Sequence, residues 1–220
     1  MEFTRTDEHE AIREGIRRIC ADFPDEYWSQ VDEAHEFPWA FYDKLAEGGW
    51  VGIAIPEEHG GGGRGITEAS IMLEEIAASG AAMNGCSAIH LSIFGMEPVR
   101  RHGSPELARE VLPRVASGEL HVAFGVTEPD AGTDTTRIRT RAVRDGDEYV
   151  VTGAKVWTTK APYCELCLLL VRATPREECE KPTDGMTLLL VDLQDPAVDI
   201  TPIPKLGRNA VVSCEVRYDG

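Results

Sequence analysis

A stretch near the middle of the chain, HVAFGVTEPDAGTDTTRIRT over residues 121–140, holds residues whose types and spacing suit chemistry. It joins an apolar strand pattern to a Thr-Glu-Pro corner and then to a run of small and polar residues. Pro129 fixes its own φ and Gly132 permits a positive φ, which explains part of this composition. A hairpin alone needs only a pair such as Asn-Gly. The surplus predicts a backbone shaped to hold a ligand.

The following residues predict the strands that would position this corner. RDGDEYVVTGAKVWTT, residues 144–159, combines an Asp-Gly turn at Asp145-Gly146 with a long β-type run, which is a hairpin signal. Val122, Phe124 and Val126 alternate with smaller residues, which also predicts a strand. Four later segments have strand composition: CELCLLLVRA, MTLLLVDL, VDITPIP and VVSCEVRY.

Before residue 120 the apolar residues recur with helical spacing. We predict one helix capped by Thr6, with Ile12 and Ile16 on its buried face. Others are predicted from Trp39 to Gly48, from Ile66 to Ala78, from Asn84 to His102, and from Ser104-Pro105 to Gly118. The predicted class is α+β, with an all-helical N-terminal domain (residues 1–119) followed by a small antiparallel β-barrel or sandwich domain (residues 120–220).

Composition excludes several classes of function. The formal net charge is −16, and nucleic acids and anionic lipids both require a cationic face. Apolar runs fall short of the ~18 residues of a membrane span. The first residues, MEFTRTDEHE, are too acidic for a secretory signal, and the six cysteines form no disulfide framework. We therefore expect a cytoplasmic protein with reduced thiols.

Two further motifs have a structural and a functional interpretation. IPEEHGGGGRG, residues 55–65, could cradle a phosphate, but it lacks the Gly-Lys-Ser/Thr ending, which favours a tight connector between helices. Cys164 and Cys167 have the spacing of half a zinc site. No second pair follows at a suitable distance, so strand packing is favoured and no metal is expected.

The combined pattern resembles the acyl-CoA dehydrogenase family. The resemblance lies in FGVTEPDAGTD (residues 124–134) and DEYVVTGAKVWTT (residues 147–159), with support from AIPEEHGGGG and LPRVASGE in the helical half. It implies a flavoprotein whose helical domain is followed by a β-barrel-like middle domain, with FAD against the barrel and an acyl-CoA thioester beside the flavin.

The resemblance also implies roles for individual residues. Backbone groups of Phe124, Val126 and Thr127 suit the polar pyrimidine end of an isoalloxazine, and the flat indole of Trp157 suits its apolar end. Thr159 would place a hydroxyl near flavin N5, with Thr158 beside it in the same motif. Gly132 would let the backbone approach the ligand. Thr133 stands where the family usually has a serine that contacts flavin or the pantetheine arm of the substrate.

For the charged residues around the corner, a structural role is favoured over a role in catalysis or CoA binding. Glu128 and Asp134 resemble a general-base pair, but the family abstracts no proton with either, so hydrogen bonding around the turn is favoured. Arg137, Arg139 and Arg141 could meet CoA phosphates, although a solvated strand face is favoured.

The reaction implied for the family is α,β-desaturation of an acyl-CoA by an FAD-dependent oxidoreductase of fatty acid metabolism. The resemblance places the catalytic base in a C-terminal helical domain beyond residue 220, so no catalytic residue is assigned here. An electron-transfer flavoprotein and assembly into a homotetramer are implied as well. Two alternatives stay open: an acyl-CoA oxidase or flavin monooxygenase of the same fold, and a non-catalytic flavin- or CoA-binding subunit.

Overall fold

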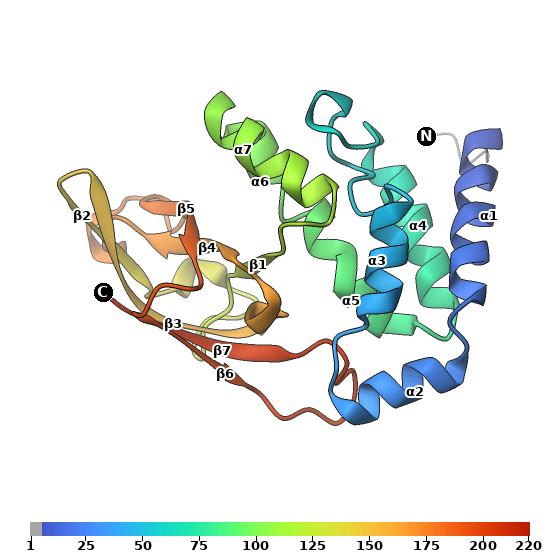
Figure 1. Cartoon of the computed structure of the whole chain (residues 1–220). Helices are drawn as coiled ribbons and strands as arrows, with labels where there is room; N and C mark the ends of the chain where they lie inside the picture. The colour runs from blue at the N-terminus through green and yellow to red at the C-terminus, as the bar shows by residue number, and fades with distance from the viewer. Residues whose placement is uncertain (1–5) are drawn as a thin grey trace. The chain divides into compact units, whose positions relative to one another are not determined.

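The computed structural model describes residues 6–220, so the first five residues of the acidic N-terminal stretch lie outside it. The chain divides into two compact units. The first runs to Leu120 and also takes in Lys205–Val211, and the second consists of His121–Pro204 and Val212–Gly220. The first unit is helical and the second contains all the described strands (Figure 1). The predicted α+β class is confirmed.

The helical unit follows most of the predicted periodicity. Thr6 caps the first helix by accepting the backbone N–H of His9, as a capping hydroxyl should. Ser104 caps the last helix in the same way, ahead of Pro105. The elements are α1 (Asp7–Ala21), α2 (Asp25–Ala34), α3 (Trp39–Glu47), η1 (Glu57–His59), α4 (Ile66–Ala78), α5 (Ala82–Ile93), α6 (Glu97–His102) and α7 (Pro105–Ala116).

Two features of this unit differ from the sequence prediction. Helix α2 was not predicted, although Pro24 precedes it and Asp25 and Glu26 occupy its first turn. The single helix predicted from Asn84 to His102 is interrupted between α5 and α6. Pro98 explains the interruption, because a proline inside a helix has no N–H to donate and its ring clashes with the carbonyl four residues earlier.

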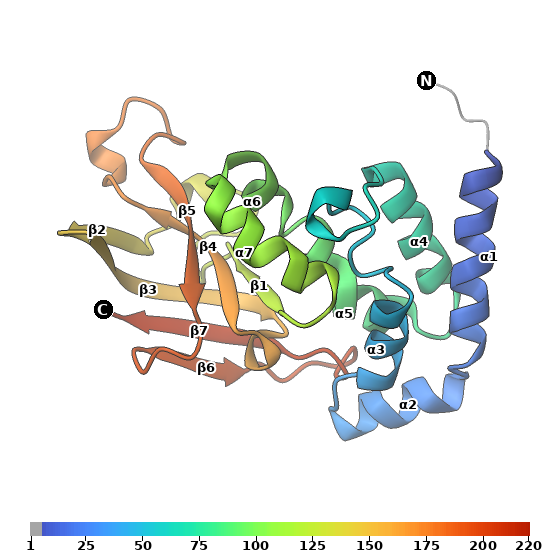
Figure 2. The same cartoon turned by 45° about the horizontal axis from the view of Figure 1, so that its top comes forward.

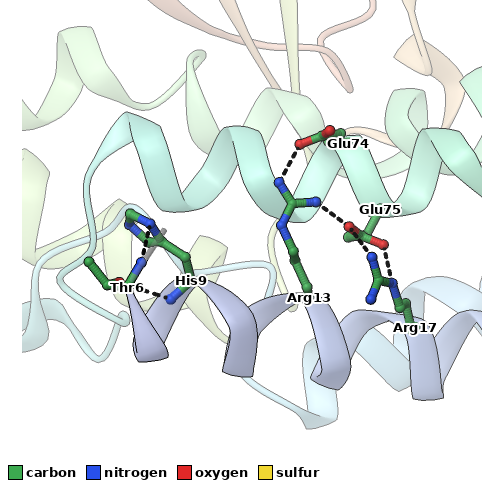
Figure 3. A network of polar contacts seen from close by, with 6 residues as sticks. All are labelled: Thr6, His9, Arg13, Arg17, Glu74 and Glu75. Atoms are coloured by element: carbon green, nitrogen blue, oxygen red, sulfur yellow. Dashed lines mark hydrogen bonds and ion pairs between the residues drawn. The ribbon is translucent and has the colours of Figure 1, made fainter. Parts of the chain in front are cut away.

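An ion-pair network centred on the buried side chains of Arg13 and Glu75 joins α1 to α4 (Figure 3). The Glu75 carboxylate binds Arg13 through Oε1 and accepts from Arg17 Nε at 2.6 Å through Oε2. Arg13 also donates to the exposed Glu74 at 2.7 Å. Burial raises the pKa of Glu75, but the hydrogen bonds from Arg17 and Arg13 outweigh it, so this pKa lies below its usual range. The network fixes the pairing of two helices far apart in sequence.

The glycine-rich loop is a connector, as favoured. The N–H groups of Gly61, Gly62 and Gly63 donate to carbonyls of Pro56, Gly52 and Ile55 at 2.8–3.1 Å. A Cβ on Gly61 would lie 2.1 Å from the Ile55 oxygen, so only glycine allows the loop to fold back this closely. These three donors are used within the unit, which removes the phosphate-cradle interpretation.

The β unit is a curled, mixed seven-stranded sheet (Figures 1 and 2). Its strand order is β1-β4-β2-β3-β7-β6, with β5 also paired to β4. Most pairings are antiparallel as predicted, but β1 and β2 run parallel to β4. The strands are β1 (Val122–Gly125), β2 (Arg141–Asp145), β3 (Glu148–Thr159), β4 (Leu166–Arg172), β5 (Met186–Asp192), β6 (Val198–Pro202) and β7 (Ser213–Asp219). Short 3-10 turns connect them: η2 (Thr135–Arg137), η3 (Ala161–Tyr163) and η4 (Arg176–Glu178).

The β unit has a hydrophobic core of its own. It includes Leu169, Val171, Val216 and Tyr218, together with several small residues. Cys164 and Cys167 belong to this core, and burial raises the pKa of the Cys167 thiol to about 11. The Cys-x-x-Cys pattern therefore serves strand packing. Within residues 6–220, no helix is long and apolar enough to cross a membrane.

Candidate functional site

The β unit carries a groove of about 550 Å³ where the Thr-Glu-Pro corner meets the end of β3. One wall comes from the corner and the other from β3, with Ile203 added after β6. The lining residues are Thr127, Glu128, Pro129, Asp130, Ala131, Gly132, Val156, Trp157 and Ile203. Two segments separated by more than twenty residues in sequence thus form one concave site.

The corner wall is built on a tight turn. The N–H of Ala131 donates to the Glu128 carbonyl at 3.1 Å, and the N–H of Glu128 donates to the Ala131 carbonyl at 2.9 Å. Pro129 takes the second position of this β-turn, where its fixed φ is favourable. Gly132 follows the turn and is exposed, and a Cβ placed on it would meet no atom within 4 Å. Gly132 does not adopt the positive φ that a glycine permits, because the turn closes before this residue.

The other wall is a β-bulge. Lys155 pairs with Val216 and Thr158 with Cys214, so two residues of β3 lie opposite one residue of β7. The extra residue turns the chain, so that Lys155 and Thr158 are both buried while Trp157 between them is 56% exposed. Trp157 has φ of 62°, a left-handed conformation that is strained for a bulky residue. The bulge presents the indole to the groove.

A buried ion pair links the two walls. The Lys155 ammonium lies 2.8 Å from Glu128 Oε1 and donates to the Val126 carbonyl at 3.1 Å. Glu128 also accepts the N–H groups of Arg139 at 2.7 Å and Thr140 at 2.9 Å. Burial raises the pKa of Glu128, but these hydrogen bonds outweigh it and hold that pKa below its usual range. Burial lowers the pKa of Lys155, and Glu128 partly offsets this.

Arg172 binds the segment that follows Gly132. Its guanidinium donates to the carbonyls of Thr136, Ile138, Pro182 and Asp184, and the side chain is buried at the end of β4. Asp134 accepts the Thr136 N–H at 3.1 Å, which starts η2. Glu128 and Asp134 are therefore hydrogen-bonded within the fold, as favoured from the sequence.

The structure brings three of the predicted cofactor residues to the groove: Thr127, Gly132 and Trp157. Thr133 is exposed next to Gly132, and Thr159 is half-buried opposite Ser213. Thr158 is directed inward, and its buried hydroxyl has no hydrogen-bond partner among the described residues.

The first two residues of the predicted pyrimidine-binding segment make internal contacts. Phe124 is half-buried within β1, opposite Leu168. The Val126 carbonyl binds Lys155, and the Thr127 carbonyl accepts the Val156 N–H at 2.9 Å.

Sequence reasoning missed Lys155, Arg172 and Ile203. Lys155 had a detectable signal, because it has the same strand parity as Val151 and therefore points toward the core. A lysine at such a position requires a buried acceptor. Arg172 had a similar signal at the end of an apolar strand, whereas Ile203 enters the groove only through the tertiary fold.

Comparison with known proteins gives a consistent picture. Residues 6–119 match the acyl-CoA dehydrogenase N-terminal domain and residues 123–220 match its middle domain. Acyl-CoA dehydrogenase FadE26 of Mycobacterium tuberculosis is 37% identical over 161 residues, covering 73% of this chain and 39% of FadE26. Benzylmalonyl-CoA dehydrogenase of Aromatoleum aromaticum is 30% identical over 221 residues, and the match covers 100% of this chain and 56% of the length of that enzyme.

The fold leads to the same group of proteins. The structure of a glutaryl-coenzyme A dehydrogenase in complex with glutaryl-CoA matches with a TM-score of 0.88 and 26% identity, covering 100% of this chain and 55% of that one. The chain thus spans about half the length of the relatives it matches. The sequence motifs, the two domain matches and the fold agree: the chain belongs to the acyl-CoA dehydrogenase family.

Proposed function

We propose that this chain forms the FAD- and thioester-binding part of an acyl-CoA dehydrogenase that desaturates an acyl-CoA between its α and β carbons. The proposal rests on family membership and on the groove between the Thr-Glu-Pro corner and the β3 bulge. One relative is named benzylmalonyl-CoA dehydrogenase after a CoA thioester, which favours a CoA thioester as the substrate class here.

The residues of the groove fit a flat, partly apolar ring system. Trp157 offers an exposed indole face for stacking, and its burial by a ring would remove apolar surface from water. The opposite wall offers polar backbone at Thr127 and an open approach over Gly132, suited to the polar edge of the ring. Because the Thr127 carbonyl already accepts a bond, its N–H is the group we assign to the flavin.

FAD, when bound, would supply a two-electron acceptor for the substrate. This chain would bind the ring through the groove and orient it with Thr159, whose hydroxyl we assign to the reactive edge. Thr133, exposed beside Gly132, is assigned to the flavin or to the pantetheine arm of the thioester. We assign proton abstraction to no residue of this chain.

The observation that carries the proposal is the shared groove of Gly132 and Trp157. Titration of the purified chain with FAD, followed by quenching of flavin fluorescence, should give saturable binding. Addition of an acyl-CoA thioester to the loaded chain should then shift the visible absorption of the flavin.

The outcomes separate the two parts of the proposal. A chain that retains no flavin after gel filtration would contradict FAD binding. Retained flavin whose spectrum is unchanged by several acyl-CoA thioesters, with free CoA as the control, would contradict the assignment of the thioester.

A further inference from the structure

We infer that Lys155 and Glu128 are positioning residues for the groove: their buried ion pair sets the spacing between the corner and the bulge. This inference rests on the proposed function and adds to it a pair of residues that act through each other. Lys155 is 0% exposed. Glu128 lines the groove but is only 8% exposed, and its carboxylate is bound by Lys155 and by the N–H groups of Arg139 and Thr140.

The pair joins three segments at one point. Lys155 comes from β3 just before the bulge, Glu128 from the corner, and the N–H groups of Arg139 and Thr140 from the chain that leads into β2. Lys155 also holds the Val126 carbonyl, one residue before the groove wall begins. The corner and the β3 bulge, which form the two walls of the groove, are therefore tied to the same two side chains.

A backbone hydrogen bond lies next to the Lys155–Glu128 ion pair and connects the same two walls of the groove. The Val156 N–H donates to the Thr127 carbonyl at 2.9 Å, and both residues line the groove. Lys155 and Glu128 are their immediate neighbours in sequence. Loss of the ammonium would leave a buried carboxylate without its counter-charge, so the corner would move away from β3 to hydrate it. The strained Trp157 would lose the constraint that maintains its left-handed backbone.

The test uses Lys155→Met, which keeps most of the side-chain length and removes the charge. Arg217→Met is the matched control, because the 67% exposed Arg217 side chain forms an ion pair with Glu215 within β7, the strand that pairs with β3. Two quantities are measured in each protein: hydrogen exchange at the Val156 amide, which needs no flavin, and the Kd for FAD.

For Lys155→Met we expect exchange at Val156 to accelerate about tenfold or more while amides of the β4–β5 ladder keep their rates, as expected for local opening. The Kd for FAD should rise about tenfold or more, and Arg217→Met should match the wild type. Equal acceleration at every amide would indicate a general structural role and would overturn the inference. Unchanged Val156 exchange and unchanged Kd would also overturn it.

Failure of the proposed function would look different, because the wild type itself would then bind no FAD while its Val156 amide still responded to Lys155→Met. If Lys155→Met does not fold, Glu128→Gln is the second variant. It keeps one acceptor oxygen for the backbone N–H groups, and it should show the same local acceleration at Val156. A folded Glu128→Gln protein with wild-type exchange and wild-type Kd would contradict the inference.

Discussion

Trp157 combines three properties rarely found together: a large apolar side chain, an exposed position and a left-handed backbone. Each alone is unfavourable or neutral for the fold, since exposed apolar surface gains nothing and positive φ is strained for a bulky residue. Strain of this kind persists where the surroundings enforce it and often marks functional sites. The bulge of β3 is the enforcing element here.

Replacement of this indole should separate binding from stability. Trp157→Ala should raise the Kd for FAD about tenfold or more, because a stacking face is lost, while the free energy of unfolding changes by less than about 1 kcal/mol. Tyr149→Ala is the matched control, since Tyr149 is 46% exposed on the same strand and lies outside the groove. Equal Kd values for the two variants would remove Trp157 from the site.

The backbone strain makes a separate prediction. Trp157→Gly should be more stable than Trp157→Ala by about 1 kcal/mol, because glycine adopts positive φ without the penalty that a Cβ causes. At Val150, a position of the same strand without positive φ, the order should reverse, so that Val150→Gly is less stable than Val150→Ala. Urea unfolding of the four variants measures both differences. A less stable glycine variant at both positions would show that residue 157 is not left-handed in solution.

At the scale of elements, the fold depends on a few buried charges that join segments distant in sequence. Glu75 joins α4 to α1 through Arg13 and Arg17, as Glu128 joins the corner to β3 through Lys155. Side chains of this kind are costly to bury and costly to leave unpaired. They therefore specify which elements pair, and their loss should weaken the contact between the paired elements.

Glu75→Gln should lower the free energy of unfolding of the helical unit by about 2 kcal/mol at neutral pH, the order expected for hydrogen bonds between charged groups. Glu74→Gln should cost much less, because the Glu74 side chain is 62% exposed against 6% for Glu75. Urea unfolding at fixed pH compares the two variants. A similar decrease in the free energy of unfolding for both variants would contradict the importance of burial for the ion pairs between α1 and α4.

The same carboxyl should contribute a pH dependence with a definite sign. Its pKa in the folded chain lies below the ordinary 4.5, so its stabilisation is complete above that value and is lost as the pH falls through the folded pKa. The difference between wild type and Glu75→Gln should therefore be constant near neutral pH and shrink in acid. A difference that grows on acidification would contradict the depressed pKa.

Local signals explain how much could be predicted from the sequence. The bounds Ile66–Ala78, the cap at Thr6 and the hairpin at Gly146 follow from periodicity and turn chemistry, which act within a few residues. The groove could be predicted only because its residues belong to a motif that resembles a known family. The bulge at Trp157, the pairing of Lys155 with Glu128 and the parallel partner of β1 could not be derived, because each is decided by segments that meet only in the folded chain.

For the whole molecule the dominant property is the net charge of −16. FAD and CoA thioesters are also anionic, so any site on this chain holds them against the overall field. Assembly into a homotetramer and an electron-transfer flavoprotein partner stay predictions of the family resemblance, and a cytoplasmic location stays a prediction from the N-terminal sequence and the cysteines.

The charge makes the salt dependence of binding informative. Raising the ionic strength from about 0.02 M to about 0.2 M should tighten FAD binding about twofold or more, because repulsion is screened. Riboflavin, which lacks the phosphates, serves as the control ligand and should show little change. Weaker FAD binding at high salt, with riboflavin unaffected, would mean that local cations around the phosphates outweigh the net charge.

The corner at residues 127–132 and the bulge at Val156-Trp157 line one groove, and we propose that this groove binds the flavin. The most direct measurement is a titration of the isotopically labelled chain with FAD, followed by the NMR signals of the Trp157 indole N–H and the backbone amides. We expect the signals of the Trp157 indole, the Thr127 amide and the Gly132 amide to shift together with one Kd. Saturable FAD binding that leaves the Trp157 indole and these amides unshifted would contradict it.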